Sequence, residues 1–225
     1  MSATVLLSGG MDSTVLLHYV AKREGDIPVF ALSFDYGQRH SRELEMARWQ
    51  AQRVAEVAEH RVVEAGWLGD LLGSSSALLR KGAPVPDLAD IGAGELRQPP
   101  TYVPNRNLIL LAAAAAYAES RGCSRVYYGA QAHDRYGYWD CTTEFVERTN
   151  QVLQLNRSSP VTIMAPFAEL RKSQEIALGT ELGVDFARTW SCYRGGVSPC
   201  GTCPTCVERE QAFEEAGIRD PLRTD

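Results

Sequence analysis

The sequence predicts an α/β fold built on a doubly wound parallel sheet, and two features of the chain carry that prediction. Short apolar runs typical of buried strands alternate with longer runs typical of helices. The first apolar run also leads through a glycine pair directly into a helical pattern. A chain of 225 residues is long enough for one substantial domain with a small appendage. We therefore expect a main domain over residues 1–185 and an appendage over residues 186–225.

Each expected strand rests on a short apolar segment. The run at residues 5–7 ends in the glycine pair, and the longer run at residues 27–34 ends in a polar loop. In open parallel sheets, ligands bind at the carboxyl edge of the strands, so loops in these places are candidate sites. The five expected strands are residues 5–7, 27–34, 60–64, 125–130 and 161–164.

The segments between these strands have helical composition. Residues 41–58 and 108–120 are rich in alanine, and the first of them has charged positions on one side. We expect Asp12 and Ser13 to cap the first helix. Residues 81–100 are rich in Gly, Pro and Asp, which predicts a surface loop. The later expected helices are residues 41–58, 108–120, 142–155 and 170–182, with short helical pieces over 67–79.

Composition limits the kind of protein. Hydrophobic residues make up 44% and charged residues 23% of the chain, as in soluble globular proteins. No apolar run is long enough to span a membrane, and the first strand follows Met1 too closely for a signal peptide. A net charge of −5 without a basic stretch argues against broad nucleic-acid affinity. We expect a cytoplasmic protein with no membrane or nucleic-acid partner.

Four of the six cysteines lie close together near the C-terminus. Cys192, Cys200, Cys203 and Cys206 follow the spacing C-x7-C-x2-C-x2-C. Zinc binds four thiolates tetrahedrally, and a closed site of this kind stabilises structure and leaves no position for substrate. A redox or sulfur-relay pair and an iron–sulfur cluster are the alternatives. We expect a structural zinc knuckle, with a C-terminal helix packed on it.

The segment Leu7-Ser8-Gly9-Gly10-Met11-Asp12-Ser13-Thr14 is the strongest candidate binding site. Glycines allow close backbone approach, and the N-terminus of the following helix supplies N–H donors and partial positive charge, which suits a phosphate group. The carboxylate of Asp12 would repel phosphate unless a cation intervenes, which favours a magnesium–nucleotide. The lysine of a Walker A loop is absent. The alternative is an ordinary strand–turn–helix connection.

Several motifs together resemble the 7-cyano-7-deazaguanine synthase (QueC) family of the N-type ATP pyrophosphatase superfamily. The loop at residues 7–13 alone is similar to the superfamily, and the later motifs in this order are similar to the family. The resemblance covers nearly the whole chain. Its motifs are residues 7–13, 34–40 (Phe-Asp-Tyr-Gly-Gln-Arg-His), 101–107 (Thr-Tyr-Val-Pro-Asn-Arg-Asn), 137–141 (Gly-Tyr-Trp-Asp-Cys) and the cysteine segment opened by 189–193.

The resemblance implies an adenine nucleotide alpha hydrolase type of Rossmann-like fold and a homodimer. It also implies a ligase that uses ATP and Mg²⁺ to adenylate the carboxylate of 7-carboxy-7-deazaguanine. Ammonia then gives the amide, and a second ATP drives dehydration to the nitrile. The implied ATP site adds Asp35, Tyr36 and Gln38 to residues 7–14. The implied substrate site holds Asp134, Tyr138, Trp139 and Asp140, and the implied charge-stabilising groups are Arg106 and Lys172.

The substrate loop departs from the usual family pattern. Tyr136, Trp139 and Thr142 stand where serine, proline and arginine are usual. We expect Trp139 to add a stacking face for a purine-like ring. The altered loop leaves a second acceptor open, namely another amine such as a protein terminus. A tRNA-thiolating enzyme of the same superfamily and a non-catalytic zinc module are further alternatives.

Overall fold

The computed structural model describes residues 2–25, 27–91, 98–131 and 138–223. Its centre is a five-stranded sheet in which every neighbouring pair of strands is parallel. The strand order is β3-β2-β1-β4-β5, so the predicted doubly wound parallel sheet is confirmed. The strands are β1 (Ala3–Leu6), β2 (Val29–Asp35), β3 (Val57–Glu64), β4 (Arg125–Tyr127) and β5 (Thr162–Met164).

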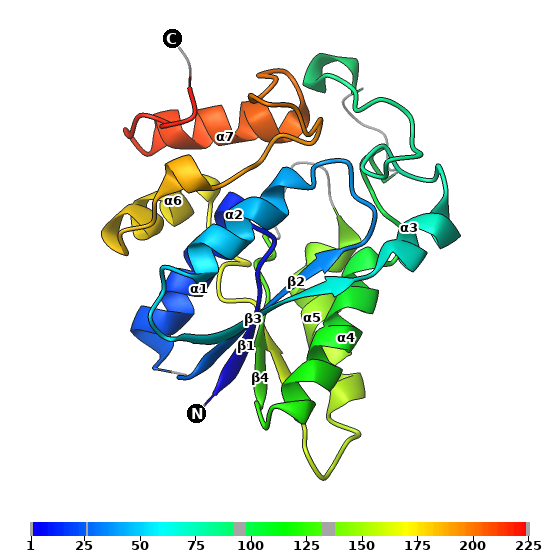
Figure 1. Cartoon of the computed structure of the whole chain (residues 1–225), viewed down its shortest axis with the longest axis vertical. Helices are drawn as coiled ribbons and strands as arrows, with labels where there is room; N and C mark the ends of the chain where they lie inside the picture. Colours follow the sequence, from blue (N-terminus) through cyan, green and yellow to red (C-terminus); the bar gives the residue numbers. More distant parts are fainter. Residues whose placement is uncertain (1, 26, 92–97, 132–137, 224–225) are drawn as a thin grey trace.

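Helices cover both faces of the sheet (Figure 1). One face packs against α1 (Met11–Tyr19), α2 (Arg42–Ala51) and α6 (Lys172–Glu181). The other packs against α4 (Arg106–Ser120) and α5 (Thr143–Leu153). Outside these layers, α7 (Pro204–Glu215) packs on α6, and α3 (Gly66–Leu72) follows β3. Short π and 3-10 turns lie at Val20–Glu24, Leu88–Asp90, Trp139–Cys141 and Phe186–Arg188.

Several predicted boundaries differ from the structure: β3 begins at Val57 and not at residue 60, and β4 ends at Tyr127 and not at residue 130. The helix expected over residues 41–58 ends at Ala51, because Val57 and the residues after it pair with β2 as a parallel strand. Strand pairing therefore overrides the helical composition of this segment. Asp12 and Ser13 are not the N-cap of α1: both lie inside the helix, and its N-cap is Gly10, which has no side chain to cap the helix.

The strand order places a crevice at one edge of the sheet. β1 lies between β2 and β4, so the chain crosses over in opposite directions on either side of it. The carboxyl ends of β1 and β4 diverge at this switch point, which is where open α/β sheets bind ligands. Within the described residues, none of the helices is both long and apolar enough to cross a membrane.

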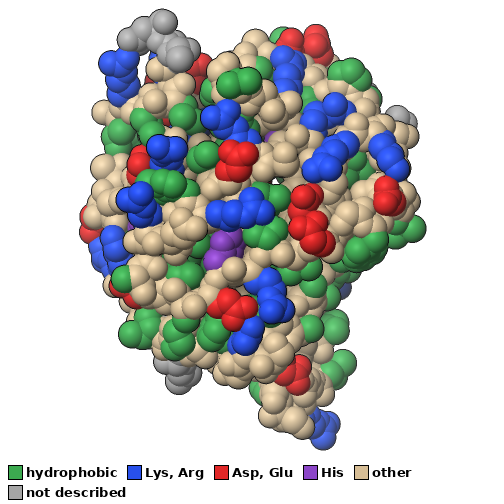
Figure 2. Space-filling model, in the orientation of Figure 1, with side chains coloured by type: hydrophobic (Ala, Val, Ile, Leu, Met, Phe, Trp, Pro, Cys, Tyr) green, Lys and Arg blue, Asp and Glu red, His purple; other side chains and the backbone are tan. Residues whose placement is uncertain are grey.

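Charges are mixed over the face of the molecule shown in Figure 2. Lys and Arg side chains are interspersed there with Asp and Glu side chains, and those that are drawn form no continuous basic surface.

Candidate functional site

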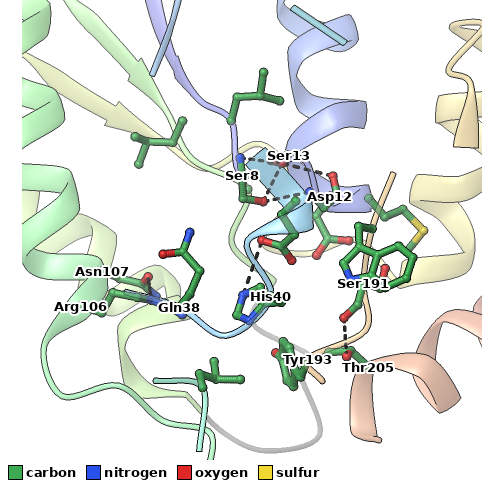
Figure 3. A pocket seen from close by; sticks show the side chains of 18 of the residues that line it. Ser8, Asp12, Ser13, Gln38, His40, Arg106, Asn107, Ser191, Tyr193 and Thr205 are labelled. Atoms are coloured by element: carbon green, nitrogen blue, oxygen red, sulfur yellow. Dashed lines mark hydrogen bonds and ion pairs between the residues drawn. The ribbon is translucent and has the colours of Figure 1, made fainter. Parts of the chain in front are cut away.

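A cavity of about 270 Å³ opens at the switch point. Its walls come from the loops after β1, β2 and β4, from the N-terminal turns of α4 and α6, and from the cysteine segment (Figure 3). Segments that are distant in the sequence therefore meet around one space. The lining includes the expected residues Leu7, Ser8, Gly10, Met11, Asp12, Ser13, Tyr36, Gln38, Arg106, Tyr138 and Lys172.

The loop after β1 is held in shape by its own hydroxyl groups. Ser13 Oγ accepts hydrogen bonds from the backbone N–H of Ser8 at 3.1 Å and of Gly9 at 3.2 Å. Ser8 Oγ accepts from the N–H of Gly10 at 3.1 Å. Gly9 has a φ of 91°, and a Cβ there would lie 1.9 Å from the backbone oxygen of Glu43, so only glycine fits. The N–H groups of Ser8, Gly9 and Gly10 thus bond the loop's own hydroxyls, and the loop leads into the N-terminus of α1, whose partial positive charge suits phosphate oxygens.

Lys172 extends from the first turn of α6 to the same loop. Its ammonium lies 3.3 Å from Asp12 Oδ2 and 3.5 Å from Glu208 Oε2. Asp12 Oδ1 is buried and makes no hydrogen bond to any described residue. A carboxylate with one oxygen paired and the other unpartnered fits a cation held together with phosphate groups.

Arg106 lies across the cavity from the loop (Figure 3). Its guanidinium donates to the hydroxyl of Tyr36 and to Asn107 Oδ1, each at 3.1 Å. Burial raises the pKa of the Tyr36 phenol, while the charge of Arg106 opposes that rise. Among the described residues, three cationic side chains line the cavity: Arg106 of α4, Lys172 of α6 and Arg209 of α7.

The expected ATP residues after β2 have different surroundings. The Gln38 amide accepts from the N–H of Tyr36 and donates to the carbonyl of Phe34, so its side chain shapes the loop from within. Asp35 does not line the cavity; its carboxylate accepts from the N–H of Gly37 at 3.3 Å and pairs with Arg80 at 3.6 Å. Gly9 and Thr14, also expected at the ATP site, do not line the cavity, and Thr14 is fully buried.

Two cavity residues, His40 and Glu43, were missing from the expected site. Nε2 of His40 lies 3.6 Å from Oε2 of Glu43, and both side chains are largely buried. Burial lowers the pKa of His40 to about 3 and raises the pKa of Glu43 to about 8. The available signal was the three-residue spacing at the start of a helix, which brings a loop residue and a first-turn residue together.

Glu175 was also missed. It lies on the buried stripe of α6 and is 0% exposed, and neither carboxyl oxygen makes a hydrogen bond to a described residue. Burial raises the pKa of Glu175 well above its ordinary value, and the negative charge of Asp12 adds to the rise. The indication in the sequence is the spacing of Glu175 from Lys172: residues three apart lie on the same face of a helix, and Lys172 was expected at the site.

The expected substrate residues are divided between two places. Tyr138 lines the cavity, and its hydroxyl lies 2.7 Å from Thr101 Oγ1. Asp140 does not line the cavity; it is only 2% exposed, and burial raises its pKa. Trp139 does not line the cavity; it lies in the wall of a second, shallow hollow, packed edge-on against Phe145. Asp134 lies outside the described residues.

The position of Trp139 changes the expected effect of replacing it. We now expect Tyr138→Ala to weaken binding of a deazaguanine acid by about 1–3 kcal/mol, the scale of stacking on an aromatic ring. Trp139→Ala should weaken binding less, because its indole donates to the hydroxyl of Tyr102 outside the cavity. Isothermal calorimetry of the two variants compares the effects directly. A larger loss for Trp139→Ala would show that the indole contacts the ligand.

The four cysteines of the C-terminal segment form a cluster. Their sulfur atoms all lie within 4.8 Å of one another, and Cys200 and Cys206 have sulfurs 3.9 Å apart. Four thiolates at about 2.3 Å from a single tetrahedral zinc ion would be about 3.8 Å apart. The cluster therefore fits one metal ion with four protein ligands. Cys123 and Cys141 lie outside this group.

The cysteine segment also contacts the loop after β1. The N–H of Trp190 donates to the carbonyl of Gly9 at 3.0 Å, and Ser191, Tyr193 and Thr205 line the cavity. Arg209 of α7 donates to the hydroxyl of Thr189 at 2.8 Å and pairs with Asp220. Described residues between Trp190 and Arg209 thus contribute one wall of the cavity. That residues 186–225 form a separate metal-binding unit stays a proposal.

Together, the parallel sheet and the Ser-Gly-Gly-x-Asp-Ser loop at its switch point define an α/β protein of the adenine nucleotide alpha hydrolase type. Within this class the chain belongs to the QueC family, since residues 2–217 match the family described as "Queuosine biosynthesis protein QueC".

Known proteins similar to this chain agree with that assignment. The chain is 42% identical over 222 residues to the 7-cyano-7-deazaguanine synthase of Caldicellulosiruptor bescii, covering 99% of this chain and 96% of that relative. It is 41% identical over 228 residues to the enzyme of the same name from Archaeoglobus fulgidus, covering 100% and 91%.

Solved structures with the same fold are more distant in sequence. NMN synthetase from Francisella tularensis superposes with a TM-score of 0.53 at 16% identity, covering 97% of this chain and 78% of that one. A 4-thiouridine synthetase solved with RNA and ATP gives 0.52 at 17%, covering 96% and 51%. At such low identity the likeness is one of fold.

Proposed function

We propose that this chain is an ATP-dependent ligase that converts 7-carboxy-7-deazaguanine and ammonia, through the amide, to 7-cyano-7-deazaguanine. The observation that carries the proposal is the family match over residues 2–217, which includes the complete loop from Leu7 to Ser13. The location of that loop in the wall of the cavity supports it.

The residues of the cavity have roles that follow from the chemistry. A carboxylate is a poor electrophile because its leaving group would be oxide, and adenylation replaces that group with AMP. The carboxylate oxygen attacks the α-phosphorus of ATP, and the bond to pyrophosphate breaks. The loop that contains Ser8, Gly10 and Ser13 would hold the departing pyrophosphate, since it lines the cavity and leads into the N-terminus of α1, where the helix dipole favours negative charge.

The charged side chains would stabilise the transferring phosphorus. Lys172 of α6 and Arg106 of α4 both line the cavity, and each would meet negative charge that builds up as pyrophosphate leaves. Asp12 would hold Mg²⁺ through its unpartnered oxygen. The ion would neutralise part of the phosphate charge.

We place substrate binding at the part of the cavity wall that contains Tyr138, away from the loop after β1. Tyr138 offers an aromatic face and a hydroxyl in the cavity, and Asp140 is buried two residues further along the chain. Carboxylates suit the donor groups of a guanine-like ring, so we assign Asp134 and Asp140 to that recognition. In the second stage the amide oxygen would attack the α-phosphorus of another ATP and displace pyrophosphate, and loss of AMP together with the two protons of the amide nitrogen would leave the nitrile.

Zinc at Cys192, Cys200, Cys203 and Cys206 would have a structural role, because four protein ligands leave no open position. The ion would hold the segment that bonds Gly9 and closes the cavity. We also propose a homodimer, which light scattering of the purified chain tests directly.

The mode of ATP cleavage tests this proposal. Incubation with the deazaguanine acid, ammonia and magnesium should release AMP and pyrophosphate, because the loop lacks a Walker lysine and matches a pyrophosphate-binding pattern. Chromatography of the nucleotides and an enzymatic pyrophosphate assay give the two products separately. ADP and phosphate as main products would contradict the proposal. Omission of the acid is the control, and it should suppress release of both products.

A further inference from the structure

Glu43 places a carboxyl group beside the loop after β1. It lies in the first turn of α2, and its side chain is 13% exposed and lines the cavity. Its Oε1 is 3.8 Å from the position that a Cβ on Gly10 would occupy. A substrate activated on that loop would therefore react within reach of this carboxyl.

The surroundings of Glu43 favour reversible protonation. Burial raises its pKa to about 8, Arg106 of α4 opposes the rise, and Asp12 of α1 adds to it. His40, in the loop before α2, is neutral at pH 7 because burial lowers its pKa to about 3. The charge of Glu43 also acts on Tyr36, whose phenol pKa is raised mainly by burial. A carboxyl group that titrates near the working pH is well suited to general acid–base catalysis.

The proposed reaction needs such a group at its nitrogen steps. When ammonia adds to the adenylated carboxylate, a C–N bond forms and the nitrogen becomes positively charged. That nitrogen must lose a proton before the C–O bond to AMP breaks and the amide forms. The net products are amide, AMP and one proton, so a nearby acceptor is required. The adenylation step releases no proton and needs no acceptor.

We propose that Glu43 accepts the proton that nitrogen loses during amide formation, with His40 positioning its carboxyl group. This inference rests on the proposed function and adds one residue to it. The other carboxylates that line the cavity among the described residues are Asp12 and Glu208, and both are paired with Lys172. Glu43 instead faces an uncharged His40 at 3.6 Å. Among the described carboxylates that line the cavity, Glu43 is thus the one that forms no ion pair with a lysine.

The pH dependence follows from the sign of the shift. A proton acceptor must be ionised, so amide formation should speed up as pH rises through about 8. Bound phosphate groups add negative charge near Glu43 and should move the inflection higher. The rate of ATP–pyrophosphate exchange, which reports adenylation alone, should not show this inflection.

The test compares Glu43→Gln with Glu45→Gln, a matched change at an exposed position of the same helix. Two rates are measured for each variant: ATP–pyrophosphate exchange with the deazaguanine acid but no ammonia, and amide plus nitrile formation at fixed free ammonia. Glu43→Gln should keep exchange within a few-fold of wild type and lose product formation by roughly 10²–10⁴-fold, the range for general acid–base catalysis. Glu45→Gln should retain both rates.

Three outcomes would overturn the inference. Product formation by Glu43→Gln at the wild-type rate would exclude Glu43 as the acceptor. Equal loss of both rates in folded protein would place Glu43 in nucleotide binding. If Glu43→Gln does not fold, the wild-type pH profiles decide, and the same inflection in both rates would exclude the role. If the wild type and Glu43→Gln both form product at the same rate, the inference fails and the proposed function stands. If the wild type shows neither exchange nor product, both fail.

Discussion

Replacing Cys203 with serine should remove the metal from the C-terminal cluster and lower the free energy of unfolding by more than about 4 kcal/mol, a loss typical of metal sites. Cys203 is 0% exposed, and its sulfur is one of four that surround a single position. Metal binding to such a cluster contributes directly to folding, because the unfolded chain does not preform the site. Elemental analysis and urea unfolding measure the two effects.

The matched control is Cys123→Ser, which makes the same chemical change at a buried cysteine outside the cluster. This variant should retain one metal ion per chain. The cluster variant should also bind ATP more weakly, since Trp190 of the same segment bonds the carbonyl of Gly9. Wild-type protein without metal, or with iron and sulfide, would show that the cluster is not a zinc site.

Alanine at Asp12 or Ser13 should reduce turnover at least about 10³-fold while leaving the protein folded. Asp12 is partly exposed, and its ion pair with Lys172 at 3.3 Å contributes little stability, about 0–1 kcal/mol. The loss of Ser13 leaves two loop N–H groups without their acceptor, which costs about 1–3 kcal/mol. Neither cost is enough to unfold a typical domain.

Asp70→Ala is the control for Asp12→Ala, because it also breaks a carboxylate–lysine pair, at 2.9 Å from Lys81, but away from the cavity. Steady-state rates should show loss of turnover in Asp12→Ala but not in Asp70→Ala, and circular dichroism should show that both variants are folded. Near wild-type turnover in Asp12→Ala would exclude the loop from catalysis.

The sequence was sufficient to predict a parallel sheet, since most of its strands are short apolar runs separated by helical segments; β3, which contains Glu59, His60 and Arg61, was recognised only in part. The end of α2 was not predictable from composition, because pairing of Val57 with β2 decides it. The loop at Ser8 and the cysteine spacing were readable because their chemistry is local. In contrast, the positions of Glu43 and Glu175 depend on packing between helices that no single segment encodes.

The substrate wall was the least predictable part. The pattern around Tyr138 indicated aromatic residues near the substrate, but it did not indicate that Trp139 packs on Phe145 instead. Tyr138 precedes the 3-10 turn and lines the cavity, whereas Trp139 begins the turn and does not, and only the tertiary structure distinguishes these neighbours. The role expected for Asp134 stays a prediction, since that residue lies outside the described structure.

Mass spectrometry of the reaction product tests the central proposal most directly. The chain is incubated with 7-carboxy-7-deazaguanine, ATP, magnesium and isotope-labelled ammonia. We expect the amide to appear first and the nitrile to follow, both carrying the labelled nitrogen, with one AMP released for each stage. A labelled amide that never becomes nitrile, or an acid that is consumed without taking up labelled nitrogen, would contradict the proposed reaction.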